Sequence, residues 1–167
     1  MQRATLGLGG NIGDPVHAMA DALRHLDARA DCRVAAVSRV YRTPPWGKTD
    51  QADFFNACAA VETTLSPEAL LDACLGIELE MKRVRVERWG PRTIDIDVLT
   101  YGEVRQVTGR LELPHPRMTT RGFVLKPLSD FAPSLAVEGR TVADWLAEAD
   151  TAGIADAGFA DGWWKTA

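Results

Sequence analysis

Two aspartates separated by a single residue follow directly after an arginine-rich stretch, and this combination is the strongest chemical signal in the chain. Asp95 and Asp97 lie within residues 93–99, which have the alternating pattern of a β-strand. Because side chains alternate between the two faces of a strand, both carboxylates share one face, roughly 6–7 Å apart. The apolar residues between and beside them face a core, which would hold the carboxylates rigidly: Ile94, Ile96 and Val98.

Two carboxylates this close repel each other unless a cation offsets their charge. Oxygen ligands suit Mg²⁺, which binds proteins through one or two carboxylates and completes its shell with water and substrate phosphates. The pair could bridge two such ions. The preceding stretch, expected to be a loop over residues 83–92, has a single acid, Glu87, among its arginines: Arg83, Arg85, Arg88 and Arg92. One guanidinium group can bind two phosphate oxygens at once through parallel N–H groups. The aspartate pair and the arginines together therefore predict a clamp for a nucleoside triphosphate.

Each half of this signal has a simpler interpretation when taken alone. An Asp-x-Asp pair on a strand is more often a solvated face than a metal site. An arginine-rich loop is more often an exposed loop or a nucleic-acid-binding patch. Their direct adjacency, with Gly90-Pro91 fixing the turn between them, favours the phosphate and metal interpretation.

Composition places the chain among ordinary globular proteins. Its 167 residues suit one domain, with 46% hydrophobic and 25% charged residues. The net charge of −4 argues against a nucleic-acid binder, and the local positive charge favours a small anionic ligand. Three cysteines without metal-type spacing predict buried thiols in a reducing cytoplasm. No long apolar run or signal peptide is visible, so we expect no membrane span.

Periodicity predicts alternating strands and helices. Strands are expected over residues 5–8, 33–41, 54–63 and 93–99, with a return strand through about residue 107. Helices are expected over residues 15–28, 67–82 and 117–128 and from Thr141 onward, and a tight turn at residues 9–11. The order predicts an α+β layered domain over residues 1–149, with a mostly antiparallel sheet and helices on its faces. Residues 150–167 are expected to form a loosely held tail, which Trp163 and Trp164 could dock.

Other residues could contribute to a ligand site. Residues 43–50 form a proline-restricted loop whose Trp46 could cover a ligand or lie on the surface. Phe54 and Asn56 share one strand face, giving a flat heterocycle a stacking surface and a hydrogen-bonding partner. Glu78 borders the buried stripe of its helix, pointing toward the arginine stretch.

With these residues in view, Arg88-Trp-Gly-Pro-Arg-Thr-Ile-Asp-Ile-Asp-Val-Leu99 strongly resembles the signature of the 6-hydroxymethyl-7,8-dihydropterin pyrophosphokinase family. Further matches follow in the same order over residues 4–148: Gly7-Leu-Gly-Gly-Asn11, Tyr41-Arg-Thr-Pro-Pro45, Phe54-Phe-Asn56, Ile77-Glu78, Arg110, Pro114-His115 and Arg121-Gly-Phe123. The resemblance implies a ferredoxin-like fold and a role in folate biosynthesis. It also implies transfer of the β,γ-diphosphate of ATP to the pterin hydroxymethyl group, releasing AMP.

The resemblance also implies residue roles. Asp95 and Asp97 would hold two Mg²⁺ ions, and Arg83 and Arg92 would act with them in catalysis. ATP contacts are implied for Glu78, Arg85, Arg88, Ile96, Arg110, His115 and Arg121. Pterin contacts are implied for Thr43, Pro44, Pro45, Phe54, Asn56, Trp89 and Phe123, with Phe54 and Phe123 sandwiching the ring. The chain departs from the family pattern at Gly10, Trp46, Leu75 and Pro116.

Two rival functions use the same residues differently. A non-enzymatic module could bind single-stranded nucleic acid through an arginine and tryptophan loop, but it would not need two carboxylates on one face. A metal-dependent phosphohydrolase would need a base to position water, and no candidate stands out. The expectation is therefore a cytoplasmic, monomeric enzyme acting on two small molecules, ATP and the pterin, without nucleic-acid or membrane partners.

Overall fold

The computed structural model describes residues 1–45, 51–87 and 93–165, and the side chains of these residues except 83–87 and 93. Its first half runs in the order β1 (Gln2–Ile12), α1 (Pro15–Asp27), β2 (Cys32–Val37), β3 (Tyr41–Thr43), β4 (Phe54–Thr63), α2 (Pro67–Glu87) and β5 (Thr93–Tyr101). The remainder runs β6 (Gln106–Val107), β7 (Glu112–Leu113), a 3₁₀ turn (Met118–Thr120), α3 (Gly122–Leu128), β8 (Ala136–Val137), β9 (Arg140–Thr141), α4 (Val142–Glu148) and β10 (Ala155–Asp156).

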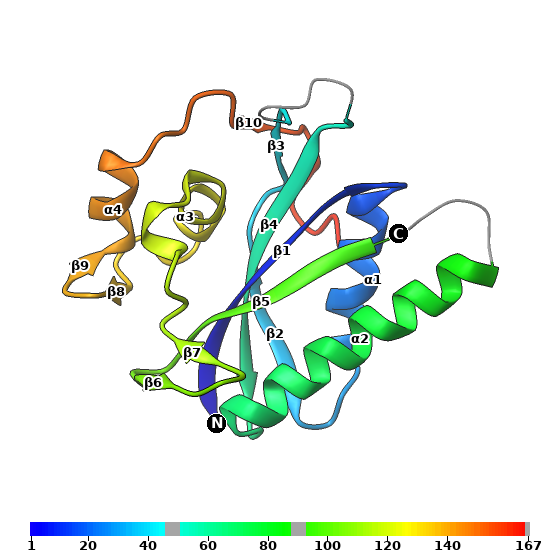
Figure 1. The fold of residues 1–167 in the computed structure, drawn as a ribbon, viewed down its shortest axis with the longest axis horizontal. Helices are drawn as coiled ribbons and strands as arrows, with labels where there is room; N and C mark the ends of the chain where they lie inside the picture. Colours follow the sequence, from blue (N-terminus) through cyan, green and yellow to red (C-terminus); the bar gives the residue numbers. More distant parts are fainter. Residues whose placement is uncertain (46–50, 88–92, 166–167) are drawn as a thin grey trace.

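The main sheet is antiparallel throughout the described residues, with β1 between β4 and β5. Its strands lie in the order β10-β3-β4-β1-β5, and β2 pairs with the far end of β4. Long ladders join β1 to β4 on one side and to β5 on the other. The predicted α+β architecture with a mostly antiparallel sheet is therefore confirmed (Figure 1).

The two faces of this sheet carry separate hydrophobic cores. One face packs on α1 and α2, where Leu6, Ile96 and Leu23 are among the most buried residues. The opposite face is covered in part by α3 and α4, with a core that includes Cys58, Leu99 and Leu125. Figure 1 shows these helix pairs on different sides of the strands. Because α3 covers only part of this second face, a cavity remains there beside the strands.

The helices predicted to begin at residues 15 and 67 begin there in the structure, and a side-chain cap precedes each of them. Asp14 caps α1, its side chain accepting a hydrogen bond from the His17 N–H at 3.1 Å, and Pro15 occupies the first helical position. The predicted stripe of α2 is the face that packs on the core. No helix within the described parts of the chain is long and apolar enough to cross a membrane.

Two predicted boundaries were wrong. β1 does not turn at residues 9–11 but runs on to Ile12, because Gly9 is paired on both sides, with Asn56 and with Asp95. The glycine with positive φ is Gly13, at 69°. The helix predicted to end at residue 82 continues to Glu87, so the backbone of Arg83 and Arg85 belongs to α2 rather than to a loop. Arginine and glutamate are good helix formers, which favours this continuation.

Two further elements are divided where a single one was predicted. The strand expected over residues 33–41 is two strands, β2 and β3, separated at Ser38, which bonds to Cys58 through both its backbone N–H and its side chain. The helix expected over residues 117–128 is a 3₁₀ turn followed by α3, because Arg121 between them has an extended backbone with φ −105° and ψ 104°.

The C-terminal segment also differs from the loosely held tail that was expected. β10 pairs with β3, and the side chains of Trp163 and Trp164 are buried in the core beneath α1 and α2. The expected docking by the two tryptophans is thus observed. Composition alone predicted a loose segment because alanine, glycine and aspartate dominate it, while the docking depends on two large side chains reaching a distant core.

Candidate active site

Two glycines in the central strand create a hollow on the open face of the sheet. In the β1 ladders, Gly7 lies between Cys58 and Asp97, and Gly9 lies between Asn56 and Asp95. Residues that are paired across neighbouring strands project to the same face. The glycines therefore place no side chain of β1 between the side chains of β4 and those of β5, and the floor of the hollow is backbone.

Gly9 is additionally required by the position of Asn56. A Cβ atom at residue 9 would lie 2.3 Å from the Asn56 Oδ1 atom, which is closer than nonbonded atoms can approach. The Asn56 amide thus extends over β1 at Gly9, where no side chain obstructs it.

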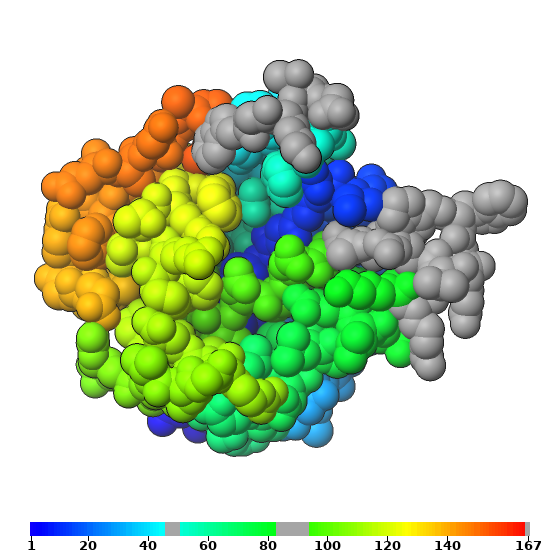
Figure 2. Space-filling view, in the orientation of Figure 1, coloured from blue at the N-terminus to red at the C-terminus, as the bar shows by residue number. Residues whose placement is uncertain are grey.

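The hollow is a cavity of about 430 Å³ between the sheet and the start of α3. Figure 2 shows it on the viewed face, bordered by the yellow-green chain of α3 and the green chain of β5, with the blue of β1 beneath. Eight of the predicted site residues line it: Thr43, Pro44, Phe54, Asn56, Asp95, Asp97, Arg121 and Phe123. Residues from four separate stretches of sequence therefore meet at one cavity.

One wall of the cavity carries the two aspartates. Asp95 and Asp97 are exposed, and neither forms a hydrogen bond or ion pair with another described side chain. No cluster of three or more metal-binding side chains occurs within the described residues. A cation held here would therefore take two carboxylates from the chain and its remaining oxygens from water or a ligand, which is the pattern that Mg²⁺ favours.

The other end of the cavity is aromatic and carries an unsatisfied polar atom. Phe54 at the start of β4 and Phe123 in α3 both line it, and the Arg121 guanidinium lies 5.6 Å from the centre of the Phe123 ring. Thr43 is only 4% exposed, and its Oγ1 atom is the single buried side-chain oxygen or nitrogen in the described structure without a hydrogen-bond partner. A buried polar group of this kind normally has a partner, so a ligand atom is a natural one.

Glu78 supports the aspartate strand from behind. Its side chain accepts a hydrogen bond from the Ile96 backbone N–H at 2.6 Å, and it does not line the cavity. Partial burial raises the pKa of Glu78, the hydrogen bond from Ile96 opposes that rise, and the charges of Asp95 and Asp97 add to it. Glu78 thus fixes the peptide between the two aspartates.

His115 is half-buried beside the same strand, and its own backbone N–H donates to the Leu99 carbonyl at 2.8 Å. The pKa of His115 is lowered, chiefly by burial. The negative charge of Asp97 opposes this shift, and the positive charge of Arg121 adds to it. The imidazole therefore lies close enough to Asp97 and Arg121 to feel their charges, but it does not line the cavity.

Several other predicted residues are not brought to the cavity. Arg110 is exposed and forms an ion pair with Asp72, and Pro45 is half-buried but does not line the cavity. Ile96 has its side chain in the core, so only its backbone faces the aspartate side. The predicted side chains of Arg83, Arg85, Arg88, Trp89 and Arg92, and Trp46 in the predicted cover, lie outside the described residues.

The cavity also includes residues to which the sequence assigned no role. Backbone and small side chains supply most of them: Gly7, Leu8, Gly9, Gly10, Asn11, Ile12, Ala57, Cys58 and Val124. The signal that could have found them is the cluster of glycines inside a strand, because glycine in a strand interior often marks close approach of a ligand or another chain segment.

Fold and cavity together define an α+β protein with a cavity that is aromatic at one end and carboxylate-lined at the other. The model of the 7,8-dihydro-6-hydroxymethylpterin-pyrophosphokinase (HPPK) family matches residues 5–133. The chain belongs to this family, and it is an enzyme of the pyrophosphokinase class.

Curated relatives and solved structures agree with this membership. A 2-amino-4-hydroxy-6-hydroxymethyldihydropteridine pyrophosphokinase from Methylorubrum extorquens is 52% identical over 154 residues, covering 92% of this chain and 98% of the relative. One of the same name from Pseudomonas aeruginosa is 43% identical over 155 residues, covering 92% and 96%. The crystal structure of wild-type Plasmodium falciparum HPPK-DHPS matches with a TM-score of 0.66 at 17% identity, which supports the fold. The match covers 87% of this chain but only 40% of that longer one.

The raised pKa of Glu78 predicts a pH-dependent effect of Glu78→Gln on stability. A folded-state pKa above the ordinary value of 4.5 means that ionised Glu78 is disfavoured in the folded state. The folded state therefore becomes less stable as the pH rises from 4.5 through the folded-state pKa. Glutamine keeps an acceptor for Ile96 without the charge. The variant should be more stable than wild type at pH 7, and the difference should vanish below pH 4.5.

Urea unfolding at both pH values measures this difference. The control is Glu103→Gln, which removes an exposed carboxylate at the other end of β5 and should give no pH-dependent difference. A Glu78→Gln variant less stable than wild type at neutral pH would show that the ionised carboxylate stabilises the fold.

Proposed function

We propose that this chain transfers the β,γ-diphosphate of ATP to the hydroxymethyl group of 6-hydroxymethyl-7,8-dihydropterin, with Mg²⁺, giving AMP and the pterin diphosphate. The observation that carries the proposal is the single cavity that joins an aromatic end to a pair of carboxylates. A pterin needs stacking surfaces and polar partners for its ring edge, and a magnesium–nucleotide complex needs oxygen ligands. Family membership supports the same assignment and its place in folate biosynthesis.

The aromatic end suits the pterin. Phe54 and Phe123 come from different elements and offer ring faces for stacking. Asn56 presents an amide, which both donates and accepts, and the Thr43 hydroxyl lacks a partner. A bicyclic ring with nitrogen and oxygen atoms along its edge would satisfy these groups while its hydroxymethyl arm extends toward the aspartates.

Asp95 and Asp97 would hold the metal, and two ions are proposed because the resemblance implies two and a pair of carboxylates can bridge them. Bound there, Mg²⁺ would neutralise phosphate charge and draw the triphosphate and the hydroxyl together. Both carboxylates are exposed, so a cation could reach them. The rigid apolar face of β5 keeps both carboxylates directed into the cavity.

Arginine and histidine side chains would hold the phosphates through their N–H groups. Arg121 lines the cavity and His115 lies near it, so both could contact phosphate oxygens. The resemblance assigns further phosphate contacts to Arg83, Arg85, Arg88, Arg92 and Arg110, and a role in covering the pterin to Trp89. These assignments rest on the sequence.

The proposed reaction forms one bond and breaks one. The pterin hydroxymethyl oxygen forms a bond to the β-phosphorus, and the bond between the β-phosphorus and the oxygen bridging to the α-phosphate breaks. That oxygen leaves with the bonding electrons as part of AMP, and the hydroxyl proton is released. Chemistry of this type depends mainly on positioning and charge neutralisation, which a preorganised site supplies.

The first test is phosphorus NMR of the purified protein with ATP, magnesium and 6-hydroxymethyl-7,8-dihydropterin. AMP and a pterin diphosphate should both appear, dependent on the pterin and abolished when EDTA removes the metal. Formation of ADP would contradict diphosphate transfer. Salt-dependent binding of single-stranded RNA without turnover would instead favour the nucleic-acid module.

Replacing Asp97 by asparagine should remove nearly all turnover while leaving the fold unchanged. The substitution preserves side-chain size but removes the charge that a hard cation requires. Steady-state rates at increasing magnesium concentration, together with Mn²⁺ binding measured by electron paramagnetic resonance, check this. Glu103→Gln serves as the control carboxylate. Wild-type Mn²⁺ binding and turnover in Asp97→Asn would contradict the metal assignment.

Thr43→Val tests the polar partner of the pterin. Valine has the shape of threonine, and it removes a buried hydroxyl without a protein partner, so stability should stay the same or rise by about 1 kcal/mol. KM for the pterin should rise while KM for ATP is unchanged. A loss of stability with an unaltered pterin KM would mean that the hydroxyl serves the fold.

A further inference from the structure

We propose that residues 150–164 position the pterin end of the cavity by holding together its two walls, the β3 end at Thr43 and Pro44 and the α3 start at Arg121 and Phe123. This role rests on the proposed function. The segment lies outside the residues that match the family model, 5–133. It lines no part of the cavity, so it would act on the pterin only through the residues that it supports.

The first support is a strand pairing. β10 pairs with β3 through Ala155 with Arg42 and Asp156 with Tyr41, and the Ala157 N–H donates to the Val40 carbonyl at 2.8 Å. β3 has only three residues and would otherwise be an edge strand at this point. β10 therefore fixes the backbone immediately before Thr43 and Pro44.

The second support is close packing against both walls. A Cβ atom at Gly153 would lie 3.1 Å from Cγ of Pro44, and one at Gly122 would lie 2.3 Å from the Asp150 carbonyl oxygen. Gly122 stands between Arg121 and Phe123, two residues that line the cavity. Residues 150–153 thus lie against the Pro44 ring on one side and the first turn of α3 on the other.

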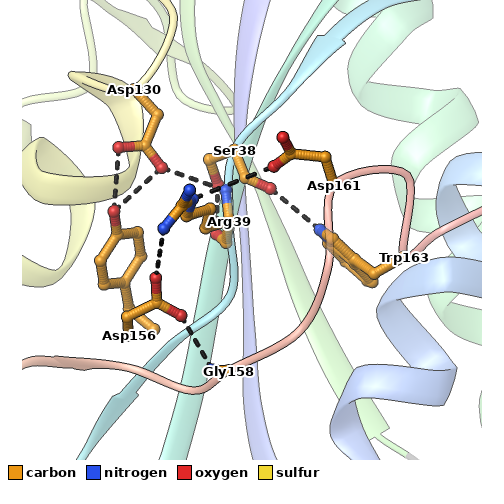
Figure 3. A network of polar contacts seen from close by, with 8 residues as sticks. Ser38, Arg39, Asp130, Asp156, Gly158, Asp161 and Trp163 are labelled. Carbon is orange, nitrogen blue, oxygen red and sulfur yellow. Dashed lines mark hydrogen bonds and ion pairs between the residues drawn. The ribbon is translucent and has the colours of Figure 1, made fainter.

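The third support anchors the far end of the segment. The Trp163 indole N–H donates to the Ser38 carbonyl at 2.9 Å, and its ring is buried in the core. Arg39 forms an ion pair with Asp156 at 2.9 Å, and the Asp156 carboxylate also accepts from the Gly158 N–H. Figure 3 shows this network between the segment and the chain that leads into β3.

The same network reaches the end of α3. Asp130 accepts hydrogen bonds from the Arg39 backbone N–H at 3.0 Å and from the Tyr41 hydroxyl at 2.9 Å. Asp130 is labelled in Figure 3 on the opposite side of Arg39 from Trp163. β3 is thereby held between α3 and the C-terminal segment, and a displacement of the segment should be transmitted to Pro44.

Gly153→Ala and Gly158→Ala form a matched pair for testing this. Both glycines have positive φ, 81° and 87°, so alanine introduces comparable backbone strain at each. Only at Gly153 does the new methyl group meet Pro44, because nothing lies within 4 Å of a Cβ at Gly158. The difference between the variants therefore isolates contact with the cavity wall from strain within the segment.

Gly153→Ala should raise KM for the pterin on the order of tenfold relative to Gly158→Ala, because small displacements of positioning residues weaken productive binding strongly. KM for ATP should remain within about twofold in both. Calorimetric titration of the pterin in the presence of α,β-methylene ATP, which cannot release the diphosphate, should show the same loss of affinity.

Trp163→Phe provides a second test at the anchor, since it removes the hydrogen bond to Ser38 while keeping an aromatic ring. It should raise the pterin KM and leave the ATP KM unchanged. Equal pterin affinity in Gly153→Ala and Gly158→Ala, or equal increases in both KM values, would overturn the inference while the proposed function stands. If wild-type protein neither binds nor turns over the pterin, the proposed function itself fails.

Discussion

The absence of side chains at Gly7 and Gly9 is the constraint on which the rest of the site depends. The two flanking strands project Asn56 and Cys58 on one side and Asp95 and Asp97 on the other, all to one face. Any side chain on the central strand between them would fill the cavity. Because Gly7 and Gly9 are each paired with both β4 and β5, the floor is held in place even though glycine itself favours no strand.

One face of the sheet packs against helices and stabilises the fold, and the other face lines the cavity. One face is sealed by α1 and α2 over a continuous core, so β5 is fixed by Ile94, Ile96 and Val98. Its other face can then hold two carboxylates close together, an arrangement that self-repulsion would disfavour in a mobile segment. Glu78 adds a third negative charge nearby, and its hydrogen bond to the peptide of Ile96 offsets part of the cost of its burial.

The aromatic end has a different construction, because its residues do not come from the rigid centre of the sheet. Thr43 is the last residue of a short strand, Pro44 follows it, and Phe123 belongs to a seven-residue helix beyond the 3₁₀ turn. Such elements need support from elsewhere in the chain to keep a fixed geometry. Hydrogen bonds from Asp130 and pairing with β10 supply it, and they connect residues about 90 to 120 positions apart.

Much of this could be predicted from local sequence. Alternation identified β4 and β5, and helical periodicity identified α1 and α2. Residue types identified the aspartate pair, Phe54 and the amide of Asn56, whereas Phe123 was expected from the resemblance. Errors arose where a local signal met a long-range contact. Glycine suggested a turn at residues 9–11, but two long ladders carry the strand through, and the alanine- and glycine-rich end suggested a loose tail that two tryptophans anchor.

By itself, the sequence determined which groups are available and in what local pattern, because strand alternation and helix periodicity depend only on neighbouring residues. It thus established the carboxylate pair on one face and the apolar face behind it. The tertiary structure decided which groups meet: Asn56 over Gly9, Phe123 near Thr43, and residues 150–153 between Pro44 and α3. Those contacts depend on strand order and on packing between segments far apart in the chain, and no local pattern specifies either.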